Sequence, residues 1–336
     1  MKNPSKLALL AMAVLSCAGI GEAQSINAAG ATFPEFVYKK WFNDYKTAHP
    51  GIEINYQAIG SGGGIKQLTA GTVDFGASDR PLTDAEMADP ALKIKPIYFP
   101  TVVGGIVPAY NLPGVTTQLK FTGEVLAGIF LGKINKWNDP KIVELNKGVK
   151  LPADDIAVVH RSDGSGTTFV FTEYLAKVSP EWKAGPGVNQ SPKWPTGTGG
   201  PQNEGVAGAV KQTPGSIGYV ELTFILSNKG MQYGQVKNAA GSFISASVET
   251  VTAAADGLTT FPVSITNAPG KNAYPISTMT YLLIPSTIPD AKKREAIKGF
   301  LAWALKDGQK LAPPLGYSPL PKEVIAAELK QLPQVK

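Results

Sequence analysis

The chain has 336 residues, of which 43 % are hydrophobic and 17 % are charged, and it includes 36 glycines and 27 prolines. This length and composition exclude a largely disordered chain and suit one large or two medium globular domains. The formal net charge of +6 is compatible with a nucleic acid, an anionic lipid surface or a small anion as partner.

The first 23 residues have the pattern of a secretory signal peptide. Lys2 and Lys6 form a basic region, an apolar run follows over residues 7–20, and small residues end at Ala23. The apolar run is too short to span a membrane. We therefore expect residues 1–23 to be removed and the mature protein to reside in the periplasm.

Cys17 is the only cysteine, so cleavage after residue 23 leaves a mature chain without a disulfide. The alternative is a lipoprotein signal that acylates Cys17 and anchors the protein. Leu15 is unusual just two residues before a lipidated cysteine, which favours plain cleavage.

Predicted strands and helices alternate along the mature chain. Period-two alternation or a short apolar run, which is typical of a strand, occurs at residues 52–57, 72–78, 98–111, 155–160, 216–222 and 277–284. Helical periodicity or a helix start signal occurs at residues 34–49, 83–86, 139–146, 292–310 and 321–329. This alternation predicts an α/β protein with largely parallel sheets. No segment has the composition of a linker, so we expect two domains, if present, to be joined by strands or short loops.

The densest basic run, residues 292–310, places Ile297, Phe300 and Leu301 on one helical face. We interpret its lysines as the solvated side of that helix. Aromatic residues do not alternate with basic ones as a nucleic-acid platform requires. We therefore expect no nucleic-acid partner.

Three turns rich in glycine, serine and threonine precede helices: AAGATFPEFVY (28–38), AIGSGGGIKQL (58–68) and RSDGSGTTFVF (161–171). Such a junction exposes backbone N–H groups at the positive end of a helix dipole, and glycine lets an oxyanion approach them. Ordinary capping by serine or threonine explains any one of these turns. Three together, one beside Arg161, favour an oxyanion site. Asp163 is positioned to hold the planar fork of Arg161 in place.

Enzyme motifs do not fit these turns. Ile65 stands where a phosphate-binding Walker loop has its second glycine, and Asp163 stands where a nucleophile elbow around Ser165 has a glycine. With 2 histidines and no mature cysteine, the chain is poorly supplied for a zinc or two-metal centre. His160 either lines the site beside Arg161 or only packs at a strand end. We expect a binding protein without a metal or a cofactor.

The same motifs resemble those of a known family. The segments NAAGATFPEFVYKKW, NYQAIGSGGGIKQL, TVDFGASDRPLT, FPTVVGGIVPAYN, LGKINKWNDP and RSDGSGTTFVFTEYLAKV occur in this order along nearly the whole mature chain. They are similar to the periplasmic phosphate-binding proteins of bacterial high-affinity phosphate ABC transporters. One departure is Gly62, where the family often has a second serine.

The resemblance implies a two-lobed α/β binding protein of type II, whose two crossover strands form the hinge near residues 101–108 and 274–282. It implies residues 24–104 and 278–336 in lobe 1 and residues 105–277 in lobe 2. Hinge closure would bury inorganic phosphate between the lobes, and membrane permease subunits would be the partners of a monomeric protein.

The resemblance also implies a set of ligands. Phosphate would be held by Thr32, the backbone N–H of Phe33, Ser61, Asp79, Arg161, Ser165, Gly166 and Thr167, with Asp163 orienting Arg161.

Two alternatives remain open. The first is a binding protein of the same fold for sulfate, molybdate or tungstate. Asp79 discriminates against it, because a carboxylate in the site suits only an anion that still carries a proton. The second is a secreted phosphatase or hydrolase, which turnover of a chromogenic phosphate ester would reveal.

Overall fold

A computed structural model describes residues 24–228 and 230–336. The predicted signal peptide (residues 1–23) and Cys17 lie outside the described residues. Within the described part of the chain, no helix combines the length and the apolar character needed to cross a bilayer.

The strands are β1 (Gln24–Gly30), β2 (Ile52–Ala58), β3 (Phe75–Ser78), β4 (Pro96–Asn111), β5 (Lys120–Phe121), β6 (Ala157–Arg161), β7 (Thr198–Gly200), β8 (Ser216–Glu221), β9 (Gln232–Tyr233), β10 (Gln235–Lys237), β11 (Phe243–Ile244) and β12 (Ser277–Pro285). The helices are α1 (Glu35–Ala48), α2 (Ser61–Ala70), α3 (Asp84–Met87), α4 (Gly123–Phe130), α5 (Pro140–Leu145), α6 (Gly166–Val178), α7 (Pro180–Ala184), α8 (Gln202–Gln212), α9 (Leu222–Leu226), α10 (Val248–Ala254), α11 (Ala291–Ala304) and α12 (Lys322–Gln331). Short 3₁₀ turns η1 (Gly308–Leu311), η2 (Pro313–Leu315) and η3 (Leu332–Gln334) lie near the C-terminus.

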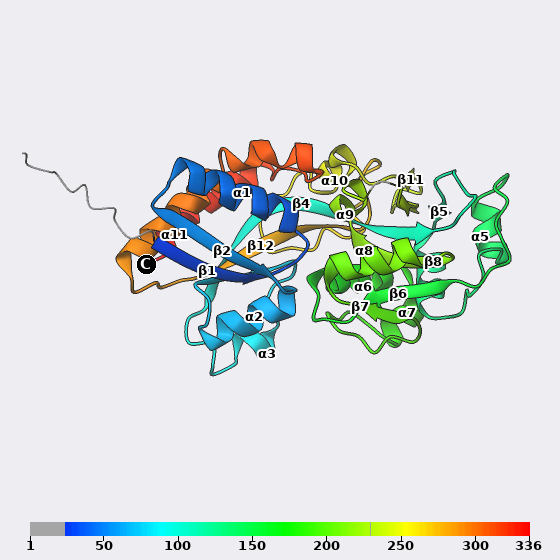
Figure 1. The fold of residues 1–336 in the computed structure, drawn as a ribbon, viewed down its shortest axis with the longest axis horizontal. Coiled ribbons are helices and arrows are strands. Elements are labelled where there is room, and N and C mark those ends of the chain that lie inside the picture. The colour runs from blue at the N-terminus through cyan, green and yellow to red at the C-terminus, as the bar shows by residue number, and fades with distance from the viewer. Residues whose placement is uncertain (1–23, 229) are drawn as a thin grey trace, which may run out of the picture.

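Every strand and helix predicted from periodicity is present, with shifted ends, and the predicted capping box of Thr83 and Glu86 is formed. Strand β1 was not predicted, because Gln24–Gly30 has a polar start and small apolar residues instead of large alternating ones. It pairs with β2 on one side and β3 on the other. Small side chains at Ala28 and Ala29 suit this position, since helices pack against both faces of the sheet nearby (Figure 1).

Strand β4 joins the two parts of the main sheet, whose order is β2-β1-β3-β12-β4-β8-β6-β7. Residues 96–105 of β4 pair with β12, and residues 106–111 pair with β8. We call β2, β1, β3 and β12 the first half of the sheet and β8, β6 and β7 the second half; they lie to the left and right in Figure 1.

The expectation of largely parallel sheets is correct at the two ends of the main sheet and wrong in its middle, around β12 and β4. β1 runs parallel to β2 and β3, and β6 runs parallel to β7 and β8. β12 runs antiparallel to β3 and β4, and β4 runs antiparallel to β8. The long apolar run of β4 resembles a parallel strand in sequence because a strand covered on both faces is apolar throughout, whatever its direction.

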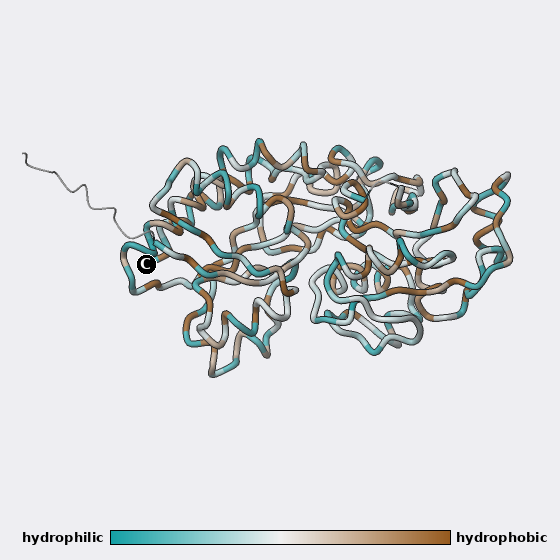
Figure 2. The backbone as a smooth tube through the Cα atoms, in the orientation of Figure 1, coloured by the Kyte–Doolittle hydropathy of each residue, from teal (hydrophilic) through white to brown (hydrophobic). Residues whose placement is uncertain are grey.

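Helix α1 shows how the outer layers attach to the sheet. Its four-residue spacing buries Val37, Trp41 and Tyr45 on one face, and burial of each large apolar side chain stabilises the fold by about 1.5–3 kcal/mol. The Trp41 indole N–H donates to the Gly308 carbonyl at 2.8 Å, so the polar group of this buried ring has a partner. Brown hydrophobic segments run through the middle of both parts of the molecule in Figure 2, and teal hydrophilic ones lie at the outside.

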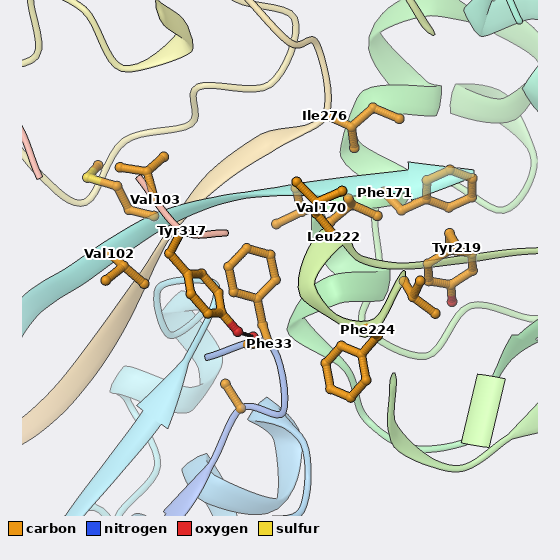
Figure 3. Packing of buried hydrophobic residues seen from close by; sticks show 14 of the residues in the cluster. Phe33, Val102, Val103, Val170, Phe171, Tyr219, Leu222, Phe224, Ile276 and Tyr317 are labelled. Atoms are coloured by element: carbon orange, nitrogen blue, oxygen red, sulfur yellow. Dashed lines mark hydrogen bonds between the residues drawn. The ribbon is translucent and has the colours of Figure 1, made fainter. Parts of the chain in front are cut away.

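The apolar core is continuous past β4. Figure 3 shows Val102 and Val103 of β4 near Phe33, which follows β1, and Tyr317, which follows η2. Val170 and Leu222, which follow β6 and β8, belong to the same core. The Tyr317 hydroxyl donates to the Phe33 carbonyl at 2.7 Å, and this bond fixes the turn between β1 and α1.

Candidate functional site

The three turns singled out in the sequence meet between the two halves of the sheet. The turns after β1 and β2 belong to the first half, and the turn after β6 belongs to the second. The Gly62 N–H donates to the Gly164 carbonyl at 2.9 Å, which joins the second turn directly to the third. A β-carbon on Gly166 would collide with Ser61 Oγ, so glycine is required where α6 faces α2.

Hydroxyl groups line this meeting point. Thr32, Ser61, Ser165 and Thr167 are all buried, at 0–1 % exposure. Ser165 caps α6, because its Oγ accepts from the Thr168 N–H at 3.0 Å, and its own hydroxyl hydrogen is still available to donate. The first N–H groups of a helix have no partner within that helix, and α2 and α6 both begin here. The result is a cluster of hydrogen-bond donors at two helix N-termini.

Phe33 places its backbone at the site and its ring in the apolar core. Its ring is fully buried, 6.4 Å from the ring of Tyr317, and its carbonyl accepts from the Tyr317 hydroxyl. Gly104 makes room for the ring, since a β-carbon there would lie 2.5 Å from Phe33 Cζ. This packing holds the Thr32–Phe33 backbone rigidly at the end of β1.

Arg161 supplies the positive charge of the site and is only 3 % exposed. Its Nε donates to Asp163 Oδ1 at 2.8 Å and its Nη2 to Asp163 Oδ2 at 2.5 Å, which is a bidentate pair. Asp163 Oδ1 also accepts from the Gln202 N–H at 3.0 Å. Burial alone would raise the pKa of Asp163, but the hydrogen bonds and charge of Arg161 outweigh it and hold that pKa below its ordinary value. Among the described residues, Arg161 Nη1 has no hydrogen-bond partner although it is buried.

Asp79 follows β3 and places a carboxylate at the same point. It is 3 % exposed, and its Oδ1 accepts from the Thr280 hydroxyl at 2.8 Å. Its Oδ2 has only a long 3.4 Å contact with Ser61 Oγ and faces the start of α6, where a β-carbon on Gly166 would lie 2.5 Å away. Burial raises the pKa of Asp79 to about 7, against the opposing effects of Thr280, Arg161 and Ser61. Because burial disfavours the carboxylate form, a hydrogen-bond donor that reaches Oδ2 would stabilise it.

Asn203 was missed in the sequence. It is fully buried in the first turn of α8, and its Nδ2 donates to Thr32 Oγ1 at 2.9 Å and to Thr167 Oγ1 at 3.2 Å. It therefore joins the first turn to the third. An asparagine near the start of a helix most often caps that helix. No local sequence pattern distinguishes such a cap from an asparagine that bonds to distant residues, as Asn203 does.

Arg80 was also missed as part of the site. Its guanidinium forms a bidentate ion pair with Glu86, with Nη1 2.7 Å from Oε2 and Nη2 2.6 Å from Oε1. It also contacts two residues outside the first half of the sheet. Its Nη2 donates to Gln190 Oε1 at 2.9 Å, and its Cζ lies 5.7 Å from the centre of the Phe169 ring in α6. Arg80 is thus a further contact across the cleft, next to Asp79.

His160 packs outside this cluster. Its ring stacks on Trp194 with the centroids 4.7 Å apart, and its Nδ1 lies 3.0 Å from the Arg161 carbonyl oxygen. The expectation that a strand-end histidine packs is the one that the structure supports.

Comparison with known proteins places the chain in a family. The PBP superfamily domain matches residues 18–307. A phosphate-binding protein PstS of Xylella fastidiosa is 47 % identical over 306 residues, covering 89 % of this chain and 82 % of the relative. A phosphate-binding protein PstS of Pasteurella multocida is 46 % identical over 323 residues, covering 94 % of this chain and 92 % of the relative. The chain belongs to the PstS family of phosphate-binding proteins.

Solved structures have the fold of this PstS-family chain. A phosphate-binding protein from Stenotrophomonas maltophilia aligns with a TM-score of 0.71 at 19 % identity, covering 92 % of this chain and 94 % of that one. An ABC-type phosphate transport receptor from Vibrio cholerae aligns with a TM-score of 0.56 at 22 % identity, covering 87 % of this chain and 99 % of that one. At these identities the likeness concerns the fold, and the predicted two-lobed α/β binding-protein fold is confirmed.

The side chains of this PstS-family site suit an anion better than a metal ion. Within residues 24–228 and 230–336, no three histidine, cysteine, aspartate or glutamate residues are grouped as metal ligands. The convergent groups are instead hydroxyls, helix N-termini and the Arg161 guanidinium, all of which donate hydrogen bonds, and the Asp79 carboxylate faces them.

Proposed function

We propose that this protein binds inorganic phosphate between the two halves of its sheet and delivers it to the permease of an ABC transporter. The observation that carries the proposal is the combination of Arg161 and Asp79. A buried guanidinium whose Nη1 has no partner among the described residues calls for an anion. A buried carboxylate beside it calls for an anion that still has a proton to donate. Phosphate at neutral pH meets both conditions, whereas fully ionised sulfate meets only the first.

The proposed ligands are those that the family resemblance implies. Arg161 Nη1 donates to one phosphate oxygen while Asp163 keeps the guanidinium oriented. Asp79 accepts from the phosphate hydroxyl. The remaining contacts come from hydroxyl and backbone donors at the three turns: Thr32, the N–H of Phe33, Ser61, Ser165, Gly166 and Thr167.

We also propose that the two halves move as lobes. Residues 24–104 and 278–336 form lobe 1, residues 105–277 form lobe 2, and β4 and β12 form the hinge. The bonds from Gly62 to Gly164 and from Asn203 to Thr32 join these lobes, so the conformation described here is a closed one. Release of phosphate to the permease requires these bonds to break.

Export follows from the N-terminal pattern. We propose cleavage after Ala23, release into the periplasm and action as a monomer, with acylation of Cys17 as the alternative. Intact mass of protein purified from the cell envelope distinguishes the two, because a chain acylated at Cys17 carries lipid mass and retains residues 17–23. Light scattering measures the oligomeric state.

Calorimetry on protein stripped of bound anion tests the proposed function. We expect tight binding of phosphate and much weaker binding of sulfate at the same ionic strength and at about pH 8.5, where Asp79 is mostly ionised. Equal binding of the two anions, or no heat with phosphate, would contradict the proposal. Hydrolysis of a chromogenic phosphate ester, above a buffer blank, would instead indicate the phosphatase alternative.

A further inference from the structure

We propose that Asn203 is a positioning residue that directs the hydroxyl hydrogens of Thr32 and Thr167 toward the bound anion. This inference rests on the proposed function, because it assigns how two of the proposed phosphate ligands are oriented.

The direction of the Asn203 amide follows from its neighbours. Its Oδ1 accepts from the Glu221 backbone N–H at 3.2 Å. A backbone N–H only donates, so the group facing it must be the carbonyl oxygen of the amide, and the assignment of Oδ1 and Nδ2 is settled by the hydrogen bonds. Nδ2 therefore faces the two threonines.

The consequence concerns where the threonine hydrogens point. Nδ2 carries two hydrogens, one for Thr32 Oγ1 at 2.9 Å and one for Thr167 Oγ1 at 3.2 Å. A hydroxyl has a single hydrogen, and Nδ2, with no acceptor capacity, repels it. Each threonine oxygen thus accepts from Asn203 and keeps its own hydrogen for another acceptor. An anion held by Arg161 is such an acceptor.

The backbone before Asn203 supports a specialised role for this turn. Gln202 has a φ of 61°, a left-handed conformation that is uncommon for a residue other than glycine. The Gln202 N–H donates to Asp163 Oδ1 at 3.0 Å. One strained turn therefore supports both Arg161, through Asp163, and the two threonines, through Asn203. Such strain occurs preferentially at functional sites.

The competing interpretation is that Asn203 only satisfies the buried Glu221 N–H. Under that interpretation its replacement lowers stability, and any effect on phosphate binding is independent of the threonine hydroxyls. Under our proposal the effect requires those hydroxyls. A thermodynamic cycle separates the two.

The experiment measures the phosphate dissociation constant by calorimetry for four proteins: wild type, Asn203→Ala, Thr32→Val with Thr167→Val, and the triple variant. We expect Asn203→Ala to weaken binding about 10- to 100-fold in the wild-type background, since hydrogen bonds to a charged group lose their orientation. In the double-valine background the same change should alter binding less than about threefold. An equal effect in both backgrounds would overturn the proposal. If wild type itself does not bind phosphate, the proposed function fails instead.

A second variant covers the case in which Asn203→Ala does not fold. Asn203→Asp keeps the side-chain size and an acceptor for the Glu221 N–H, and thermal unfolding verifies that it folds. Its carboxylate accepts from Thr32 and Thr167, turns their hydrogens away from the anion and adds negative charge. We expect it to bind phosphate at least as weakly as Asn203→Ala, and binding within about threefold of wild type would contradict the positioning role.

Discussion

Thr280 and Asp79 are 201 positions apart in the chain, and the Thr280 hydroxyl donates a 2.8 Å hydrogen bond to Asp79 Oδ1. The bond is set by the sheet, because the antiparallel register of β12 and β3 pairs Tyr281 with Ser78. One oxygen of the carboxylate is thereby occupied within the first half of the sheet. The other, Oδ2, is directed at the start of α6 across the cleft.

This geometry predicts that Asp79 discriminates between anions. Asp79→Asn replaces an acceptor with a group that donates as well, so an anion without a proton is no longer repelled. A site that requires one hydrogen bond rejects the analogue lacking it by about 10⁴- to 10⁵-fold, and we expect the ratio of sulfate to phosphate dissociation constants to fall at least tenfold in the variant. Calorimetry on both anions at one pH gives the ratio. The exposed Asp84→Asn change is the matched control, and equal ratios in all three proteins would exclude Asp79 as the discriminating group.

The raised pKa of Asp79 predicts a pH dependence for sulfate. Burial places this pKa near 7, so lowering the pH through neutrality adds a proton that the carboxyl group can donate to sulfate. If only the protonated form binds sulfate, affinity should rise about 30-fold between about pH 8.5 and pH 5.5. Asp79→Asn should abolish this slope. A flat profile in wild type would mean that Asp79 does not titrate in this range.

The buried charge of Arg161 should dominate affinity. Truncating one partner of a buried charged contact costs about 2–5 kcal/mol, so Arg161→Ala should weaken phosphate binding roughly 30- to 4,000-fold. Asp163→Asn should cost less, because the guanidinium stays in place and loses only its orienting partner. Arg294→Ala, which removes a half-buried arginine of α11, is the control. Near-native affinity in Arg161→Ala would remove this residue from the site.

Contacts of Arg80 across the cleft should slow ligand release. Gln190→Ala removes the 2.9 Å bond to Arg80 while leaving the Arg80–Glu86 ion pair intact. We expect phosphate to dissociate about tenfold faster. The bond between Arg80 and Gln190 exists only in the closed conformation, so its loss destabilises that conformation relative to the open one. Stopped-flow displacement measures the rate, with the exposed C-terminal Gln334→Ala as control. An unchanged rate would show that Arg80 does not hold the cleft closed.

Two buried glutamates should make the anion-free protein less stable at high pH. Burial raises the pKa of Glu221 to about 8 and that of Glu328 well above its ordinary value, and neither Oε1 has a partner among the described residues. A glutamate whose pKa is higher in the folded protein than in the unfolded one stabilises the fold fully below its pKa in the unfolded chain, which is about 4.5. That stabilisation is lost as the pH rises through its pKa in the folded protein. The lowered pKa values of Asp163 and Glu86 act in the opposite sense, but only in acid.

Thermal unfolding tests this stability profile. The midpoint of the anion-free protein should fall between about pH 5.5 and pH 8.5. Glu328→Gln removes one of these titrating groups and should flatten the profile. A midpoint that rises with pH, or the same slope in Glu328→Gln, would mean that the glutamate is ionised in the folded state.

Local features of the sequence predicted much of this protein. Alternation and helical spacing located the main strands and helices, and Ser165 and Thr83 cap helices where expected. The turns around Thr32, Ser61 and Arg161 stood out because glycine, hydroxyl and charge occur within a few residues of one another. Strands, helices, caps and turns of this kind depend on residues close together in the chain, so short-range sequence patterns predict them.

Only the tertiary structure decided which distant groups meet. The bonds from Asn203 to Thr32, from Arg80 to Gln190 and from Thr280 to Asp79 join residues separated by 171, 110 and 201 positions. Each depends on sheet register, on the direction of β12 and on how the halves close over one another. A single asparagine, glutamine or threonine has the same local signature whether it faces solvent or a buried partner. The sequence by itself therefore determined the donor-rich turns and their helices, whereas packing determined how those donors and the Asp79 carboxylate are oriented.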